Sequence, residues 1–200
     1  MGVVELMVIF GPPAVGKMAV GHEVCRRTGF VLLHNHLLME PLLGIFPYGS
    51  EPFGRLSGEF RRRVLEEAAE ARLPGVVFTF VWGLELPEDA RLVESYTRIA
   101  GGPVSFVELE ADLDERLRRN ATEFRLERKP SKRDLAASRE GLLRLERYAM
   151  NTDGRTCAEA RDLLDRHAHL KLDNTHLSPE AAADLIVGVT RGPAAGGPPG

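Results

Sequence analysis

The chain has 200 residues, 44% of them hydrophobic, and a formal net charge of −3 at pH 7. This size suggests one domain with a sizeable core, and the negative charge argues against a general nucleic-acid-binding protein. The two cysteines, Cys25 and Cys157, form no disulfide framework or CxxC metal motif, which favours a cytoplasmic location. The apolar N-terminus is typical of a strand, and no apolar run approaches the roughly 20 residues that span a membrane.

Short apolar runs alternate with longer segments of helical character along the chain. Strands are expected at 3–10, 30–33, 76–82, 104–109 and 170–172. Helices are expected at 17–28, 37–48 (short, with a loop), 52–72, 87–100, 112–128, 133–150, 156–166 and 178–189. This alternation predicts a three-layer α/β fold with a central parallel five-stranded sheet, in one domain over 1–190. The Gly/Pro-rich tail, 191–200, is predicted to be disordered.

The first expected strand runs directly into a phosphate-loop motif. The string GPPAVGKM matches G-x-x-x-x-G-K-[ST] up to its last letter, with strand, loop and helix in the required order. Gly11 and Gly16 allow backbone angles that turn the loop N–H groups inward to bind an anion. Lys17 would reach the β- and γ-phosphates of a nucleotide. The expected nucleotide-binding residues are Gly11, Pro12, Pro13, Ala14, Val15, Gly16, Lys17, Met18 and Ala19.

Met18 stands where the motif requires a hydroxyl residue, and Ala19 follows it. A thioether is a poor ligand for Mg²⁺, which prefers hard oxygen atoms and keeps several waters. We therefore expect ATP binding in which Mg²⁺ is held mainly by the nucleotide and water, with loss of nucleotide binding as the alternative. The usual apolar strand that ends in Asp is not clear, and the acids after strand 76–82 are Glu85 and Asp89.

Four segments make the chain resemble the small P-loop kinases, which include shikimate kinase, gluconate kinase, chloramphenicol phosphotransferase and the nucleotide kinases. The segments are GPPAVGK, VSFVELEADLDERLRRN, RLERKPSKRD and LDNTHLSPEAAADLI. The string GPPAVGKM followed by HNH is most similar to the uncharacterised AAA/shikimate-kinase-like group. The resemblance implies an α/β P-loop fold, ATP and Mg²⁺ as cofactors, and a helical lid at about 120–135. The guanine-reading N-K-x-D string is absent, so a GTPase is not expected.

The resemblance also implies roles for several basic and polar residues. Arg128, foremost, and Arg125 would close over the phosphates from the lid and balance charge on the transferring phosphoryl group. A solvated helix face is the alternative for this basic segment. Arg119 and the turn of Asn174 and Thr175 would flank adenine.

The string HNH follows the second expected strand, where small-molecule kinases place the residue that contacts the accepting hydroxyl. His36 or His34 is our candidate for that contact, with Asn35 beside it, because histidine titrates near neutral pH. A helix cap at Asn35 or His36 is the alternative. The segment GEFRRRVLE is similar to the Phe-Arg helix of shikimate kinase, which makes Arg61 a candidate anion or hydroxyl binder, unless it lies on the surface. Trp82 is either a stacking surface for a substrate ring or a core residue.

The leading hypothesis is an ATP-dependent phosphotransferase that acts on a hydroxyl of a small molecule. A nucleotide-binding regulator or slow ATPase without an acceptor is the main alternative, favoured by the missing hydroxyls at positions 18 and 19. A nucleic-acid end kinase is less consistent with the negative net charge. A zinc site at the two histidines of HNH lacks an obvious third ligand, since Glu40 is the only near acid. The sequence predicts neither the acceptor nor the oligomeric state.

Overall fold

The computed structural model describes residues 2–122 and 133–191. Five parallel strands form one sheet with the order β2-β3-β1-β4-β5. They are β1 (Val4–Phe10), β2 (Val31–His34), β3 (Gly75–Phe80), β4 (Gly101–Glu110) and β5 (Ala168–Asp173). The predicted parallel five-stranded sheet is confirmed.

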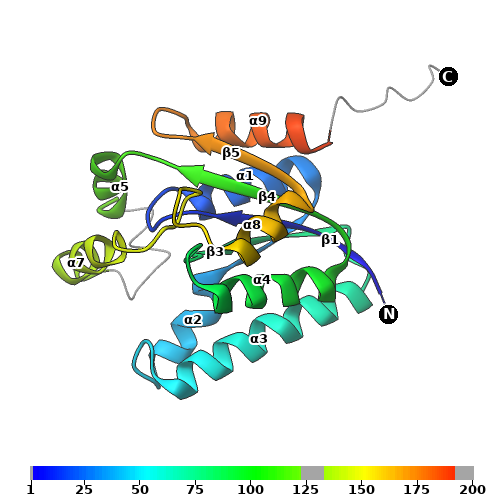
Figure 1. The fold of residues 1–200 in the computed structure, drawn as a ribbon, viewed down its shortest axis with the longest axis horizontal. Helices are drawn as coiled ribbons and strands as arrows, with labels where there is room; N and C mark the ends of the chain where they lie inside the picture. Colours follow the sequence, from blue (N-terminus) through cyan, green and yellow to red (C-terminus); the bar gives the residue numbers. More distant parts are fainter. Residues whose placement is uncertain (1, 123–132, 192–200) are drawn as a thin grey trace.

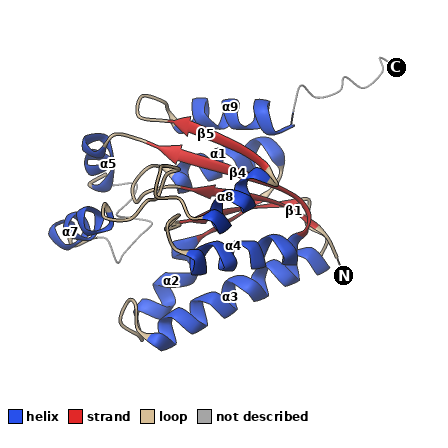
Figure 2. Cartoon of the chain, viewed as in Figure 1, coloured by secondary structure: helices blue, strands red, loops and turns tan. Residues whose placement is uncertain are grey.

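The described residues contain eight helices. They are α1 (Lys17–Thr28), α2 (Asn35–Leu43), α3 (Glu51–Glu70), α4 (Pro87–Ala100), α5 (Leu113–Asn120), α7 (Leu135–Leu145), α8 (Ala158–Asp165) and α9 (Pro179–Arg191). Helices α1 and α9 contribute to the core on one face, and α3, α4 and α8 to the core on the other. Figure 2 shows the strands between these helical layers, so the three-layer α/β prediction is confirmed.

Alternation along the central strands explains the two cores. Met7 and Ile9 of β1 face α1 and α9, whereas Leu6, Val8 and Phe10 face the opposite core. All six residues of β3 are buried, as expected for a strand that is covered on both faces.

The loop that carries the phosphate-loop motif follows the carboxyl end of β1, in the centre of the sheet. Phe10, the last residue of β1, is in register with Phe80 of β3 and Glu108 of β4. The loop after β1 therefore begins beside the ends of both neighbours, where ligands bind in open α/β sheets. In Figure 1, α5 and α7 lie beyond the carboxyl ends of β4 and β5.

The segment expected to form the lid differs from its sequence-based prediction. Helix α5 ends at Asn120, within the helix predicted at 112–128, and α7 is shorter than the expected helix at 133–150. The side chain of Asn120 is buried and accepts a hydrogen bond from Ser138 Oγ of α7 at 3.1 Å, a tertiary contact that fixes this helix end. Arg125, Arg128 and most of the predicted lid fall in 123–132, and the predicted tail in 192–200, both outside the described residues. Within the described ranges, no helix has the length and apolarity to span a membrane.

Candidate active site

The phosphate-loop motif forms a tight turn between β1 and α1. Gly11 and Gly16 have φ angles of 136° and 110°, which favour glycine. A Cβ on Gly11 would lie 2.2 Å from the carbonyl oxygen of Leu109, so the close approach to β4 also requires glycine. Gly16 is the N-cap of α1, and no side chain caps the helix there. An anion at this end of α1 would therefore meet uncapped N–H groups and the positive end of the helix dipole.

Lys17, the first residue of α1, reaches back across this turn. Its Nζ donates hydrogen bonds to the carbonyl oxygens of Gly11 at 2.6 Å and Pro12 at 2.8 Å. The ammonium group is thereby held against the loop, where it adds its charge to that of the helix N-terminus.

The residues after Lys17 offer no hydroxyl to a magnesium ion. Met18 is buried, with 6% of its surface exposed, and Ala19 follows it. Within residues 2–122 and 133–191, no three His, Cys, Asp or Glu side chains are grouped as a metal site. The residues present thus do not fit a protein-built Mg²⁺ site of the usual P-loop kind, and the expectation of a nucleotide- and water-held ion remains a prediction.

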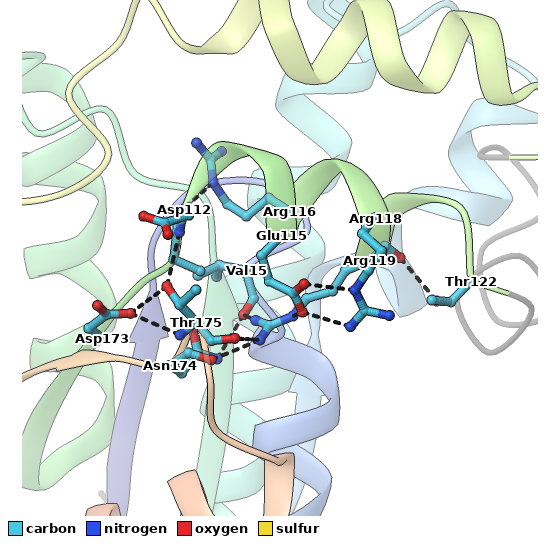
Figure 3. A network of polar contacts seen from close by, with 11 residues as sticks. Val15, Asp112, Glu115, Arg116, Arg118, Arg119, Thr122, Asp173, Asn174 and Thr175 are labelled. Carbon is cyan, nitrogen blue, oxygen red and sulfur yellow. Dashed lines mark hydrogen bonds and ion pairs between the residues drawn. The ribbon is translucent and has the colours of Figure 1, made fainter.

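Arg119 and Asn174 meet directly behind the phosphate loop (Figure 3). Arg119 Nη1 and Asn174 Nδ2 both donate to the carbonyl oxygen of Val15, at 2.8 and 2.9 Å. Arg119 Nη2 also donates to the carbonyl oxygens of Asn174 and Thr175, at 2.8 and 3.0 Å. Glu115 accepts from Arg119 Nε at 2.7 Å. The structure therefore brings these predicted nucleotide-site residues together, whereas their expected contact with adenine stays a prediction.

The turn after β5 is fixed by its own hydrogen bonds. Asp173 Oδ1 accepts from the backbone N–H of Thr175 at 2.8 Å and from its hydroxyl at 2.6 Å. These bonds lower the pKa of Asp173. The backbone N–H of Asp112 donates to Thr175 Oγ1 at 3.0 Å, which ties the turn to the start of α5. The carbonyl oxygens of Asn174 and Thr175, which accept hydrogen bonds from Arg119, therefore have defined positions.

His34 and His36 of HNH have local partners, whereas Asn35 accepts hydrogen bonds from Arg61 of α3. His34 ends β2 and caps α2, because its Nδ1 accepts from the N–H of Leu37 at 3.2 Å. The alternative, a helix that starts at Asn35 or His36, is confirmed for Asn35, whereas the capping side chain is that of His34. His36 Nδ1 lies 3.0 Å from Oε1 of Glu40, one turn later in the helix. The contact of either histidine with an accepting hydroxyl stays a prediction.

Arg61 is a buried residue of α3, so the alternative of a surface position is wrong. Only 7% of its surface is exposed. Its Nε and Nη2 donate to Asn35 Oδ1 at 3.1 and 2.6 Å, and its guanidinium carbon lies 5.6 Å from the centre of the Phe80 ring. Its Nη1 also donates to Ser57 Oγ at 3.5 Å. Its positive charge also acts on the partly buried Asp89 carboxyl group, where it opposes the burial that raises the pKa of Asp89. A buried cation held by neutral oxygen atoms and a ring face could also bind an anionic group of a ligand.

Trp82 belongs to the core and offers no face to a substrate. Its exposure is 0%, and its ring packs edge-on against Phe10 with centroids 5.2 Å apart. The prediction of a substrate-stacking tryptophan is therefore wrong. The acids beyond it are held by backbone N–H groups: Asp89 Oδ2 accepts from Gly83 and Glu85 Oε2 from Ala149. Burial raises the pKa of Asp89 above its ordinary value.

Solved kinases share this architecture. An APS kinase from Mycobacterium tuberculosis, in complex with AMPPNP and APS, has a TM-score of 0.57 at 17% identity, over 96% of this chain and 99% of that one. A shikimate kinase from Acinetobacter baumannii, in complex with shikimate, has a TM-score of 0.53 at 16% identity, over 94% and 92% of the two chains. The chain has the fold of the P-loop small-molecule kinases. A gluconokinase from Sinorhizobium meliloti 1021 has the same P-loop kinase fold, with a TM-score of 0.52 at 14% identity over 96% and 94% of the two chains. No protein-family model and no curated protein matches the sequence.

Within this P-loop kinase fold, one buried carboxylate escaped the sequence analysis. Glu108 of β4 is fully buried and accepts hydrogen bonds from the N–H and hydroxyl of Thr152 and from Asn151. His169 and Lys171 of β5 contact the same carboxylate, each at 3.1 Å. In the string VSFVELE, Glu108 lies two residues after Phe106 and so shares a strand face with it. This alternation was the sequence signal that Glu108 is buried. Its partners are 43 to 63 residues away in sequence and left no local pattern.

Proposed function

We propose that this protein transfers the γ-phosphoryl group of ATP to a hydroxyl group of a small molecule. The observation that carries the proposal is the loop before α1, where the Lys17 ammonium group and an uncapped helix N-terminus meet. In the proposed reaction the acceptor oxygen attacks the γ-phosphorus and the bond to the β,γ-bridging oxygen breaks. ADP leaves, and the proton of the acceptor passes to a base or to solvent. The shared fold with kinases for APS, shikimate and gluconate supports this reaction class.

The acceptor is proposed to bind beyond the ends of β2 and β3, beside Asn35 and Arg61. Asn35 opens α2 directly after β2, and Arg61 lies over Phe80 at the end of β3. His36 is the proposed group that orients the accepting hydroxyl, since a loose phosphoryl-transfer transition state needs orientation more than strong deprotonation. Arg128 and Arg125 are proposed to approach the phosphates from the segment outside the described residues.

Mg²⁺ is proposed to accompany ATP, bound mainly to phosphate oxygens and water. When bound, such an ion neutralises charge that develops on the phosphates. The chain's own contribution is the positive charge of Lys17 and the N–H groups at the start of α1. A cytoplasmic location is also part of the proposal, and Cys25 and Cys157 are both free thiols.

The substitution Lys17→Ala tests this assignment. Removing one preorganised donor to a transferring group typically costs about 100-fold or more in rate, so we expect kcat/KM to fall at least that far. ADP release would be measured with ATP and an active acceptor. Arg63→Ala, at an exposed site on α3 with 65% of the side chain accessible, is the matched control and should keep full activity. Undiminished transfer by Lys17→Ala would refute the assignment.

A nucleotide-binding regulator or slow ATPase is the second candidate, favoured by the absence of a hydroxyl at Met18 and Ala19. The two functions differ in their response to acceptors. Nucleotide binding would first be measured by calorimetry with and without Mg²⁺. ADP release would then be screened across nucleosides, sugar acids and aminoglycoside-type antibiotics. Stimulation by one hydroxyl compound supports the kinase, and binding without stimulation by any of them supports the regulator.

A further inference from the structure

The peptide group between Val15 and Gly16 is anchored from outside the phosphate loop. The carbonyl oxygen of Val15 accepts two hydrogen bonds, one from Arg119 Nη1 at 2.8 Å and one from Asn174 Nδ2 at 2.9 Å. The donors come from the end of α5 and from the turn after β5, 104 and 159 residues away in sequence (Figure 3). Two separate elements thus hold one carbonyl group of the loop.

This anchoring has a geometric consequence for the other half of the peptide. A trans peptide is planar, and its C=O and N–H point in opposite directions. Because the Val15 carbonyl points toward Arg119 and Asn174, the N–H of Gly16 points away from them, toward the interior of the loop. Within residues 2–122 and 133–191, no backbone carbonyl accepts a hydrogen bond from this N–H in the turn. It is therefore directed at the position where a phosphate oxygen would bind.

The peptide needs such support because of the residue that follows it. Gly16 has φ 110°, and glycine resists rotation of its flanking peptides less than other residues do. A Cβ placed on Gly16 would lie 3.3 Å from Asn174 Nδ2 and 3.7 Å from Arg119 Nη1, so both side chains pack closely on this backbone. A rotated peptide would point the Val15 carbonyl oxygen at the anion instead.

The two anchoring side chains are themselves fixed in place. Asn174 is buried, with 2% of its surface exposed. Arg119 donates through Nε to Glu115 and through Nη2 to the carbonyl oxygens of Asn174 and Thr175. The pKa of Glu115 is lowered to about 2, chiefly by hydrogen bonding to Arg118 and further by Arg119, so it is ionised at neutral pH. Each nitrogen of the Arg119 guanidinium group is thus already bonded to the protein.

We propose that Arg119 and Asn174 are positioning residues that lock the Val15–Gly16 peptide, so that the N–H of Gly16 donates to a bound phosphate. This role differs from flanking adenine, because it acts through the backbone of the loop and concerns the phosphates alone. It rests on the proposed function, since the loop must bind a nucleotide phosphate for the lock to matter.

The test compares ATP with inorganic tripolyphosphate, which has the phosphates but no base. Asn174→Asp keeps the shape of the side chain and replaces the donor to Val15 with a carboxylate oxygen, and Arg119→Met removes the other donor. We expect the Kd for tripolyphosphate and the Kd for ATP to rise together, by about tenfold or more, at fixed Mg²⁺. Arg118→Met is the matched control, because Arg118 is exposed and bonds only to Glu115 among the described residues; both Kd values should stay unchanged.

The outcomes distinguish the proposed positioning role from contact with the base and from no role in phosphate binding. If the variants weaken ATP but leave tripolyphosphate unaffected, the two residues act on the base and the lock is overturned. If neither Kd changes in a folded Asn174→Asp variant, the lock is also overturned. If the wild-type chain binds neither probe, the proposed function fails and the inference fails with it. An amide spectrum gives a second measurement: tripolyphosphate should shift the Gly16 N–H signal downfield in the wild type, and by less in Asn174→Asp.

Discussion

Glu108→Gln is a stringent test of how the sheet holds the chain that follows α7. The Glu108 carboxylate is fully buried in β4 and accepts hydrogen bonds from Asn151 and Thr152, so it fastens that segment to the carboxyl half of the strand. His169 and Lys171 supply positive or donor groups from β5. The substitution keeps the shape of the side chain and removes its charge.

The size of the effect follows from the pKa of this carboxyl group. Burial would raise the pKa, but the hydrogen bonds from His169 and Thr152 and the contact with Lys171 outweigh it and lower the pKa from 4.5 to about 2. At about 1.4 kcal/mol for each pKa unit, the ionised group adds about 3 kcal/mol to the free energy of unfolding at pH 7. Because the folded-state pKa is depressed, this stability is complete above pH 4.5 and is lost as the pH falls toward 2. At pH 3 less than half of it remains.

Urea unfolding at a series of pH values would measure this contribution. We expect Glu108→Gln to be less stable than the wild type by about 3 kcal/mol at pH 7, with the gap closing by about half at pH 3. Glu110→Gln, on the same strand and with 39% of its side chain exposed, is the control and should change the free energy of unfolding by less than about 1 kcal/mol. A gap of equal size at both pH values, or no gap at pH 7, would refute the reasoning.

Two further substitutions test the two sides of the candidate site. Arg61→Met removes a buried cation that donates to Asn35. We expect an unchanged KM for ATP and a KM for an anionic acceptor raised about tenfold or more, whereas exposed Arg62→Met should change neither. An Arg61→Met variant with an unchanged acceptor KM would remove Arg61 from the acceptor site. Met18→Ser introduces the missing hydroxyl beside Lys17, so ATP binding followed by calorimetry should reach half-saturation at a lower Mg²⁺ concentration than in the wild type; an equal Mg²⁺ requirement would show that the side chain at position 18 does not set it.

The phosphate loop was predictable because its determinants are adjacent in sequence. An apolar strand, two glycines at fixed spacing and a lysine at a helix start define a local geometry, and β1, Gly11, Gly16 and α1 lie as expected. Alternation of strands and helices likewise predicted the parallel sheet. These features depend on backbone conformation and burial pattern, both of which a single sequence expresses directly.

The burial of Arg61 could have been predicted from its spacing along the helix. The helix expected at 52–72 carries apolar residues at helical spacing, and Phe60 is one of them. In the structure Phe60 is 46% exposed, and the buried stripe contains Phe53, Ser57, Arg61 and Leu65 at intervals of four. That interval places Arg61 on the same face as two apolar residues. The helical period therefore indicated a buried arginine, although its partner Asn35 lies 26 residues away.

Helix ends and buried polar contacts were not predictable because their causes are distant in sequence. The predicted helix at 112–128 has no local stop signal at Asn120, whose side chain is fixed by Ser138 of α7. The cap of α2 depends on the residue at which β2 ends, and this selected His34 over its two neighbours. Sequence pattern identifies the residue types that cap helices, but tertiary packing decides which of them does so.

The phosphate side and the proposed acceptor side of the candidate site are held by different kinds of contact, so we expect them to respond differently to substitution. The phosphate side is a backbone structure: N–H groups, a helix end and a peptide whose carbonyl is anchored by Arg119 and Asn174. The proposed acceptor side is a side-chain structure, in which Arg61 is held by Asn35 over Phe80. Strand β3 separates β2 from β1 in the sheet, so the two sides are anchored to different strands. Substitutions on the acceptor side should therefore change the acceptor that is selected while the affinity for phosphates is retained.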